Sequence, residues 1–183
     1  LRTVSATDPL TGLPNRRALY EELDRLRGRA LREGGSVLVG VVDLDGFKGI
    51  NDTHGHQQGD VFLQEIARRL AMTLRASDMV GRLGGDEFVL IGPGPALARG
   101  DAAPGHEAQR GDAEEAARSL EDRAAAATVG RYQLGEVTLP YEGASVGVVA
   151  LDPRGLSAEE AVRLADARMY DIKRARKAAR TIH

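Results

Sequence analysis

An unbroken apolar stretch, SVLVGVVDL at residues 36–44, constrains the fold more than any other part of the chain. It is much shorter than the roughly 18 residues that a membrane-spanning helix needs, and it is rich in valine, which favours β-strands. Its apolar residues follow one another without polar alternation, as in a strand that is covered on both faces. The stretch is therefore expected to be the central strand of a sheet.

Amphipathic segments with start and stop signals surround this strand. In residues 14–35, leucines and alanines recur at helical spacing, and the Gly34-Gly35 pair then ends the pattern. Further helices are expected in residues 60–74, 112–127 and 157–175, the last opened by SAEE, a capping-box pattern. The expected N-caps are Asn15, Asp60, Asp112 and Ser157.

Short strands alternate with these helices. They are expected at residues 78–83, 87–92, 131–139 and 144–150. Glycines join the first two as a hairpin turn. Residues 92–111 are rich in glycine, proline and alanine and are expected to form a flexible connection. The whole chain, residues 1–183, is expected to be one domain with a mainly antiparallel sheet.

Composition narrows the classes of partner. The net charge is −2, and the chain has three phenylalanines, four tyrosines and no tryptophan. We therefore expect no nucleic-acid binding and no membrane contact by this domain. The absence of cysteine excludes disulfides and thiol catalysis and is compatible with a cytoplasmic location. Because the chain begins at Leu1 rather than Met, it could be part of a longer protein whose upstream region is anchored in a membrane.

Three carboxylates are expected to meet at one edge of this sheet. Asp43 ends the central strand, and Asp86 and Glu87 follow the glycine turn of VGRLGGDEFVLIG. If that hairpin pairs beside the central strand, the three charges repel one another unless a cation lies between them. All-oxygen ligands favour Mg²⁺, which binds through one or two carboxylates together with substrate phosphates. The alternative is a solvated turn that binds nothing.

The segment GFKGIND, just after the central strand, could hold those phosphates. It supplies the Lys48 ammonium and the backbone N–H groups around Gly46 and Phe47. Asn51 and Asp60 could read a nucleobase edge, since a carboxylate accepts from the N1–H and amino group of guanine. Loop structure and helix capping are the alternative roles of these two residues.

Three other kinds of site fit poorly. DLDG begins like a calcium loop, but Phe47 stands where the next oxygen ligand belongs. His54 and His56 have no third ligand nearby, so structural or substrate-facing roles suit them better than a transition-metal site. The chain has neither a G-x-x-x-x-G-K-[ST] phosphate loop nor a G-x-G-x-x-G motif after a strand, which disfavours common NTPase and dinucleotide-binding folds.

Taken together, these segments resemble the GGDEF family of diguanylate cyclases. The resemblance runs from about residue 8 to 177 and is weakest in residues 92–140. It rests on five motifs in order: DPLTGLPNRR, DLDGFKGINDTHGHQQGD, RLGGDEF, SVGV and ADARMYDIK. It implies an α/β (α+β) fold like the palm of polymerases and nucleotidyl cyclases, with a central, mainly antiparallel sheet flanked by helices. It also implies condensation of two GTP molecules into cyclic di-GMP with loss of two pyrophosphates.

The resemblance further implies roles for individual residues. The implied metal ligands are Asp43, the Leu44 carbonyl, Asp86 and Glu87, with Mg²⁺ as the ion and Mn²⁺ as the alternative. Asp86 would also take the proton of the attacking 3′-hydroxyl, and Glu87 would support a second metal or orient that hydroxyl. The implied phosphate-binding groups are the Phe47 backbone, Lys48 and Lys173, and the implied guanine and ribose contacts are Asn51, His56 and Asp60. Gly84 and Gly85 would let the nucleotide approach the backbone.

The last helix departs from the family pattern K-x-x-G-R-N. It reads KRARKA, so Arg176 replaces the glycine and Lys177 replaces the arginine. Lysine keeps the charge but lacks the bidentate fork of arginine, so a weaker grip on the triphosphate is expected.

Two expectations about assembly and control follow from the resemblance. Each domain would bind one GTP, so the reaction needs a homodimer with facing active sites. Arg75 and Asp78 of RASD match the family's R-x-x-D product-inhibition pattern, in which the arginine reads guanine. The alternative is a helix-end arginine beside a turn aspartate.

An active enzyme is the first hypothesis, and two others compete with it. One is a catalytically silent GGDEF domain that senses GTP or cyclic di-GMP; such domains usually lack acids or glycines that this chain keeps. The other is a structural dimerisation domain, which would have no reason to keep Lys48, Asn51 and Asp60 beside an acidic turn.

Overall fold

The structure is a computed structural model that describes residues 4–97 and 104–182. Its elements, in chain order, are α1 (Arg16–Glu33), β1 (Ser36–Asp43), α2 (Phe47–His54), α3 (His56–Thr73), β2 (Met79–Gly84), β3 (Glu87–Gly94), α4 (Pro104–Thr128), β4 (Gly130–Leu134), β5 (Val137–Tyr141), β6 (Ser145–Leu151) and α5 (Ala158–Ile182).

Four strands form one antiparallel sheet in the order β2-β3-β1-β6. β1 lies inside it, with Val41 opposite Val89 of β3 on one side and Gly147 of β6 on the other. The expected central strand, the hairpin beside it and the mainly antiparallel sheet are therefore confirmed.

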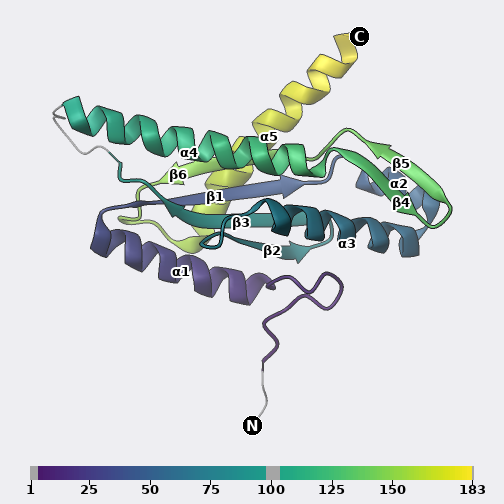
Figure 1. The fold of residues 1–183 in the computed structure, drawn as a ribbon, viewed down its shortest axis with the longest axis horizontal. Helices are drawn as coiled ribbons and strands as arrows, with labels where there is room; N and C mark the ends of the chain where they lie inside the picture. Colours follow the sequence, from purple (N-terminus) through teal and green to yellow (C-terminus); the bar gives the residue numbers. More distant parts are fainter. Residues whose placement is uncertain (1–3, 98–103, 183) are drawn as a thin grey trace.

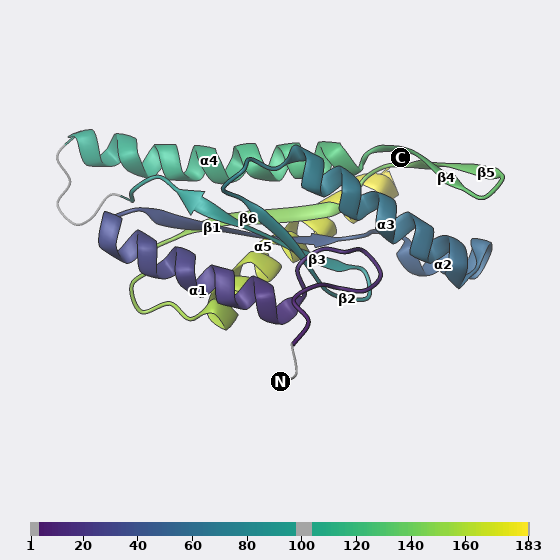
Figure 2. The ribbon, with the colours of Figure 1, turned by 60° about the horizontal axis from the view of Figure 1, so that its bottom comes forward.

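Helices cover both faces of this sheet, which explains why β1 is apolar at consecutive positions. Leu38 and Val42 belong to a core shared with α3 and α4, whereas Val37, Val39 and Val41 belong to a second core shared with α1 and α5. Figures 1 and 2 show α4 on one side of the sheet and α1 on the other. The helices and the sheet thus form three layers.

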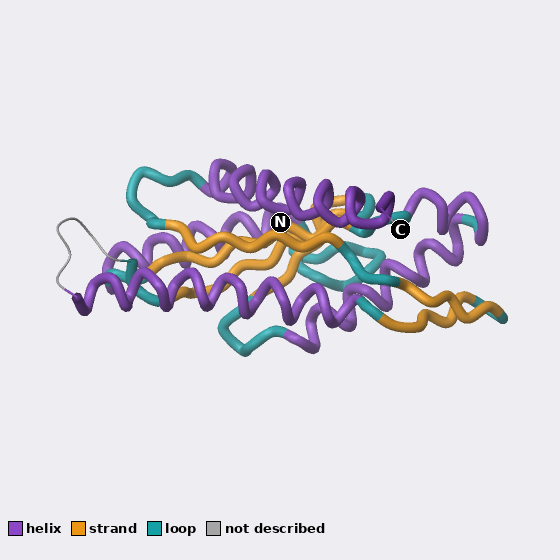
Figure 3. Tube along the Cα trace, turned by 90° about the horizontal axis from the view of Figure 1, so that it is seen from above, coloured by secondary structure: helices purple, strands orange, loops and turns teal. Residues whose placement is uncertain are grey.

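The strand expected near residues 131–139 is instead a hairpin. β4 and β5 pair with each other as a separate two-stranded sheet, turning at Gly135, whose φ is 64°. This hairpin extends from one end of the molecule (Figure 3). Its Tyr132 and Tyr141 pack edge-on against Phe62 of α3, with ring centroids 4.7 and 4.9 Å apart. Aromatic packing therefore anchors the hairpin to the domain.

The structure confirms two of the expected helix caps and corrects two. Asn15 accepts from the Ala18 amide and Ser157 accepts from the Glu160 amide, as expected of N-caps. Asp60 is not a cap, because α3 begins at His56, and Asp112 lies inside α4.

The boundaries of two further segments differ from the expectation. The connection expected over residues 92–111 overlaps β3, which ends at Gly94, and α4, which begins at Pro104; residues 98–103 lie outside the described residues. α5 extends to Ile182 rather than ending near residue 175. No helix in the described parts of the chain is long and apolar enough to cross a membrane.

The outer edge of β6 is closed by side chains of α4. Val148 donates its backbone N–H to Glu121 Oε2 at 2.8 Å, and its carbonyl accepts from Arg118. Arg168 of α5 holds the same Glu121 carboxylate at 2.7 and 3.0 Å. Side-chain groups therefore occupy the backbone positions that a further strand would use.

Candidate active site

The register of the central strands brings the predicted acids to one rim. Asp43 at the end of β1 lies opposite Glu87 at the start of β3, and Asp86 precedes Glu87 in the turn. Gly84 and Gly85 form this turn with φ angles of 144° and 51°, which other residues rarely adopt. A Cβ at either glycine would meet no described heavy atom within 4 Å, so the backbone conformation, rather than crowding within the chain, requires glycine here.

The glycine turn is held from behind by the N-terminal segment. Arg82 donates to the Gly85 carbonyl at 3.1 Å and to Asp8 at 3.0 Å. Asp8 also accepts from the backbone and hydroxyl of Thr11. Burial alone would raise the pKa of Asp8, but these hydrogen bonds outweigh it and lower the pKa. The DPLT and RLGG motifs are thus coupled parts of one site wall, a role that neither motif revealed on its own.

The electrostatics of the rim are those of crowded carboxylates. Burial, and then the charge of Asp43, raise the pKa of Asp86. Burial, and then the charges of Asp166 and Asp43, raise the pKa of Glu87. The Lys173 ammonium donates to Asp43 Oδ2 at 2.6 Å, and this bond raises the pKa of Lys173. Additional positive charge would therefore stabilise the ionised acids.

The donor set fits a hard cation that shares its ligands with a nucleotide. The described residues hold no ready-made group of three or more His, Cys, Asp or Glu side chains arranged around a metal. Mg²⁺ usually binds through only one or two carboxylates and completes its shell with water and phosphate. Asp43, Asp86 and the nearby Leu44 carbonyl supply oxygens of that kind.

A tight loop carries the predicted phosphate groups to the same rim. Gly46, with φ of 77°, caps α2, and the Phe47 amide donates to the Leu44 carbonyl at 3.2 Å. Lys48 follows in the first turn of α2 and is exposed. This N-terminus could hold phosphate oxygens together with Lys173. Lys177, one turn beyond Lys173 on α5, is exposed.

The predicted base-reading residues lie on α2 and α3. His56 and Asp60 are exposed on the first turns of α3. Asn51 Oδ1 is buried without a hydrogen-bond partner in the described residues. It fits there because Gly59 has no side chain: a Cβ on Gly59 would lie 1.7 Å from Asn51 Oδ1. An unsatisfied buried acceptor is costly, so this atom suits a ligand that brings a donor.

A part-buried acid that we did not predict lies behind these groups. Asp45 accepts from Ser145 Oγ at 2.8 Å and pairs with Arg176 and Arg180 of α5 at 3.1 and 3.2 Å. In the sequence, Asp45 stood in the rejected calcium motif and in the family motif DLDGFKGINDTHGHQQGD, but no role was predicted for it. The arginine that replaces the family's glycine at position 176 did not by itself point to Asp45.

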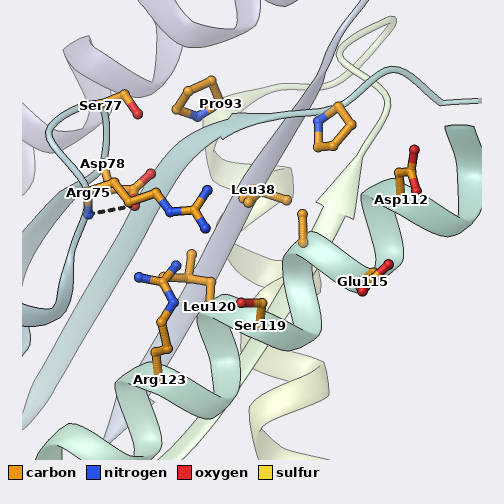
Figure 4. A pocket seen from close by; sticks show the side chains of 12 residues that line it. Leu38, Arg75, Ser77, Asp78, Pro93, Asp112, Glu115, Ser119, Leu120 and Arg123 are labelled. Atoms are coloured by element: carbon orange, nitrogen blue, oxygen red, sulfur yellow. Dashed lines mark hydrogen bonds between the residues drawn. The ribbon is translucent and has the colours of Figure 1, made fainter.

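Arg75 and Asp78 share a second cavity, away from the acidic rim. The cavity has a volume of about 330 Å³ and lies between the α3–β2 loop and α4 (Figure 4). Asp78 Oδ2 accepts from the Arg75 amide at 3.1 Å, and a Cβ on Gly92 would overlap the other carboxylate oxygen. Arg123 of α4 lines the same cavity and was missed by the sequence analysis, because nothing local links it to RASD.

A family model and many known proteins match this chain. The family model described as "Diguanylate cyclase, GGDEF domain" matches residues 5–179. Diguanylate cyclase DgcP of Escherichia coli K12 is 39% identical over 170 residues, covering 93% of this chain and 45% of that protein. This chain thus spans less than half the length of that curated relative.

Solved structures match with similar coverage. A sensory box/GGDEF family protein from Caulobacter crescentus CB15 superposes with a TM-score of 0.73 at 35% identity, covering 93% of this chain and 99% of that one. The GGDEF domain of DgcB from Caulobacter crescentus, solved in complex with c-di-GMP, superposes with a TM-score of 0.73 at 30% identity. The match covers 96% of this chain and 94% of the DgcB chain.

Proposed function

Because this chain belongs to the GGDEF family of diguanylate cyclases, we propose that it condenses two GTP molecules into cyclic di-GMP and two pyrophosphates. The observation that carries the proposal is the meeting of Asp43, Asp86 and Glu87 at one rim, with Lys173 bound to Asp43. The loop of residues 44–47, which we propose binds phosphate, follows β1 at that rim. In the proposed reaction, a 3′-hydroxyl of one GTP attacks the α-phosphate of the other, and each part of the rim has a role in that attack.

We assign the acids to metal binding and proton transfer. Asp43, the Leu44 carbonyl and Asp86 would hold Mg²⁺, or Mn²⁺, with Glu87 supporting a second ion or orienting the hydroxyl. The ion would supply positive charge to the phosphates. Asp86 would also accept the proton of the 3′-hydroxyl.

We assign the remaining groups to the nucleotide. The implied phosphate contacts are the Phe47 amide, Lys48, Lys173 and Lys177. His56 and Asp60 would contact guanine and ribose, and the acid at Asp60 favours GTP over ATP. The buried Asn51 Oδ1 would accept from the guanine amino group, which supplies the partner that the described residues do not. Gly84 and Gly85 would leave space for the nucleotide beside the turn.

The reaction requires two domains to face each other, since each site would hold one GTP. We therefore propose a homodimer as the active species, acting in the cytoplasm where GTP is available. We also propose that cyclic di-GMP inhibits the enzyme at the cavity of Arg75 and Asp78. Arg123 faces that cavity from α4 and would add a third polar contact to guanine.

Incubation with GTP and Mg²⁺, followed by chromatographic separation of the nucleotides, tests the proposal. The protein is fused to a dimeric coiled coil so that weak self-association does not limit the rate. Cyclic di-GMP is expected from the wild type and not from Asp86→Ala. Asp24→Ala, which removes a carboxylate from the exposed face of α1, serves as the matched control. GTP binding without product in the forced dimer would refute the cyclase proposal and favour the silent sensor. Equal product from Asp86→Ala would refute the assignment of this acid.

A further inference from the structure

Asp45 is a largely enclosed carboxylate to which the proposed chemistry gives no task. It lies two residues after Asp43, and its side chain is only 11% exposed. Three groups from two elements converge on its Oδ2 atom: Ser145 Oγ of β6 at 2.8 Å, Arg176 of α5 at 3.1 Å and Arg180 of α5 at 3.2 Å. A charge so enclosed is stable only while its partners stay in place.

Arg176 is the most connected of these partners. Beyond the ion pair with Asp45, it donates to the Gly143 carbonyl at 3.1 Å and to Ser145 Oγ at 3.2 Å. Its side chain is 29% exposed, compared with 50% for Arg180. The family pattern has glycine at this position, and glycine could make none of these contacts. The link between α5 and the loop after β1 is thus built from a residue that departs from the family pattern.

This link holds two parts of the proposed phosphate-binding site, Lys173 and the loop of residues 44–47. Lys173 lies one turn before Arg176 on α5, so fixing Arg176 also fixes the helix face that aims Lys173 at Asp43. Lys173 Nζ lies 3.9 Å from Asp45 Oδ1. In the loop itself, the Asp45 carbonyl accepts from the Tyr141 hydroxyl at 2.8 Å. The segment that bears the Leu44 carbonyl and the Phe47 amide is therefore held through both the side chain and the backbone of Asp45.

We propose that Asp45 and Arg176 form a clamp that positions Lys173 and the loop of residues 44–47 for the triphosphate of GTP. Both are positioning residues, since neither has to touch the nucleotide. The inference rests on the proposed function of the site. The clamp also gives a role to Arg176, which replaces the family's glycine. It organises the lysines of a helix in which Lys177 replaces the family's arginine.

Five variants test the clamp through GTP kinetics. Asp45→Asn and Arg176→Gln are each expected to raise KM for GTP about tenfold with kcat changed by less than about threefold, because they loosen ground-state contacts. Arg174→Gln removes the same charge from the exposed side of α5 and is expected to leave KM within about twofold. The double variant is expected to raise KM by less than the product of the two single effects, since the two residues share an ion pair. Arg176→Lys should raise KM less than Arg176→Gln does, because lysine keeps the charge.

Two kinetic outcomes would overturn the clamp. One is an unchanged KM in both single variants. The other is a fall in kcat at constant KM, which would place Asp45 in the chemical step instead.

Amide hydrogen exchange without nucleotide separates this inference from the proposed function. The Phe47 amide, bonded to the Leu44 carbonyl, is expected to exchange about tenfold faster in Asp45→Asn and Arg176→Gln than in the wild type or Arg174→Gln. If the wild type makes no cyclic di-GMP, the proposed function fails, but the exchange rates still decide whether the clamp exists. Equal exchange in all four proteins would overturn it.

Discussion

Gly59→Ala offers a sharp test of the nucleotide site, because it should separate binding from stability. The new Cβ would lie 1.7 Å from Asn51 Oδ1, whereas ordinary contacts begin at 3.4 Å, so the amide has to move by about 1.7 Å. The obstructing atom ends a flexible side chain and has no hydrogen bond to lose within the described residues. The fold should therefore accommodate the methyl group by turning the Asn51 amide away.

Gly59→Ala is expected to change folding stability and GTP affinity in opposite directions. Alanine in a helix interior is more stable than glycine by about 1 kcal/mol, so Gly59→Ala should keep or raise the melting temperature. Loss of one hydrogen bond to guanine costs about 1 to 1.5 kcal/mol, which corresponds to roughly tenfold weaker binding. Calorimetric titration with a non-hydrolysable GTP analogue and a thermal melt on the same sample measure both quantities.

Two comparisons complete the test. Gly28→Ala in α1, where a Cβ would make an ordinary 3.4 Å contact with Arg32, should raise stability and leave GTP affinity unchanged. Asn51→Ala should weaken binding as much as Gly59→Ala does, and the double variant should be no weaker than either. Wild-type affinity in Gly59→Ala, or fully additive losses in the double variant, would refute the reasoning.

Three further outcomes are expected. Arg75→Ala should need at least about tenfold more cyclic di-GMP than the wild type for half-inhibition, with each protein compared with its own uninhibited rate, because a guanine contact is lost. An unchanged half-inhibiting concentration would argue against the inhibitory cavity. The hydrogen bond from Arg68 lowers the pKa of Glu65 from 4.5 to about 2, so the stabilisation is complete above pH 4.5 and is lost as the pH falls through about 2. Since this pair is largely solvated, Glu65→Gln should cost about 1 kcal/mol at pH 7 in urea denaturation and nothing near pH 2. Gly147→Ala should cost about 3 kcal/mol, because its Cβ would overlap the Met169 backbone, which cannot turn aside; an unaltered midpoint would contradict this packing.

The central sheet and the acidic rim were predictable because their signals are local. The consecutive apolar residues of β1 report burial on both faces, and the Gly-Gly turn of the next hairpin fixes which residues point to the rim. Once β3 pairs with β1, the register places Glu87 opposite Asp43 without further information.

The errors occurred where backbone geometry or distant residues decide the structure. α3 begins at His56 because Gly55, with φ of 89°, sets the chain direction, so the polar Asp60 misled the search for a side-chain cap. The short turn at Gly135 was too brief to divide two strands by composition. The partners of Asp45 lie 100 to 135 residues away, beyond the reach of any pattern in the sequence.

Two domains that meet face to face, as we propose for this chain, also risk joining side by side. An open strand at the margin of a sheet can recruit the same strand of another copy and start a polymer. Here the Val148 amide and carbonyl are already engaged by Glu121 and Arg118, so the middle of β6 is not free to pair with a strand of a second molecule. At this edge of the sheet, another copy would first have to displace two side chains before strands could pair.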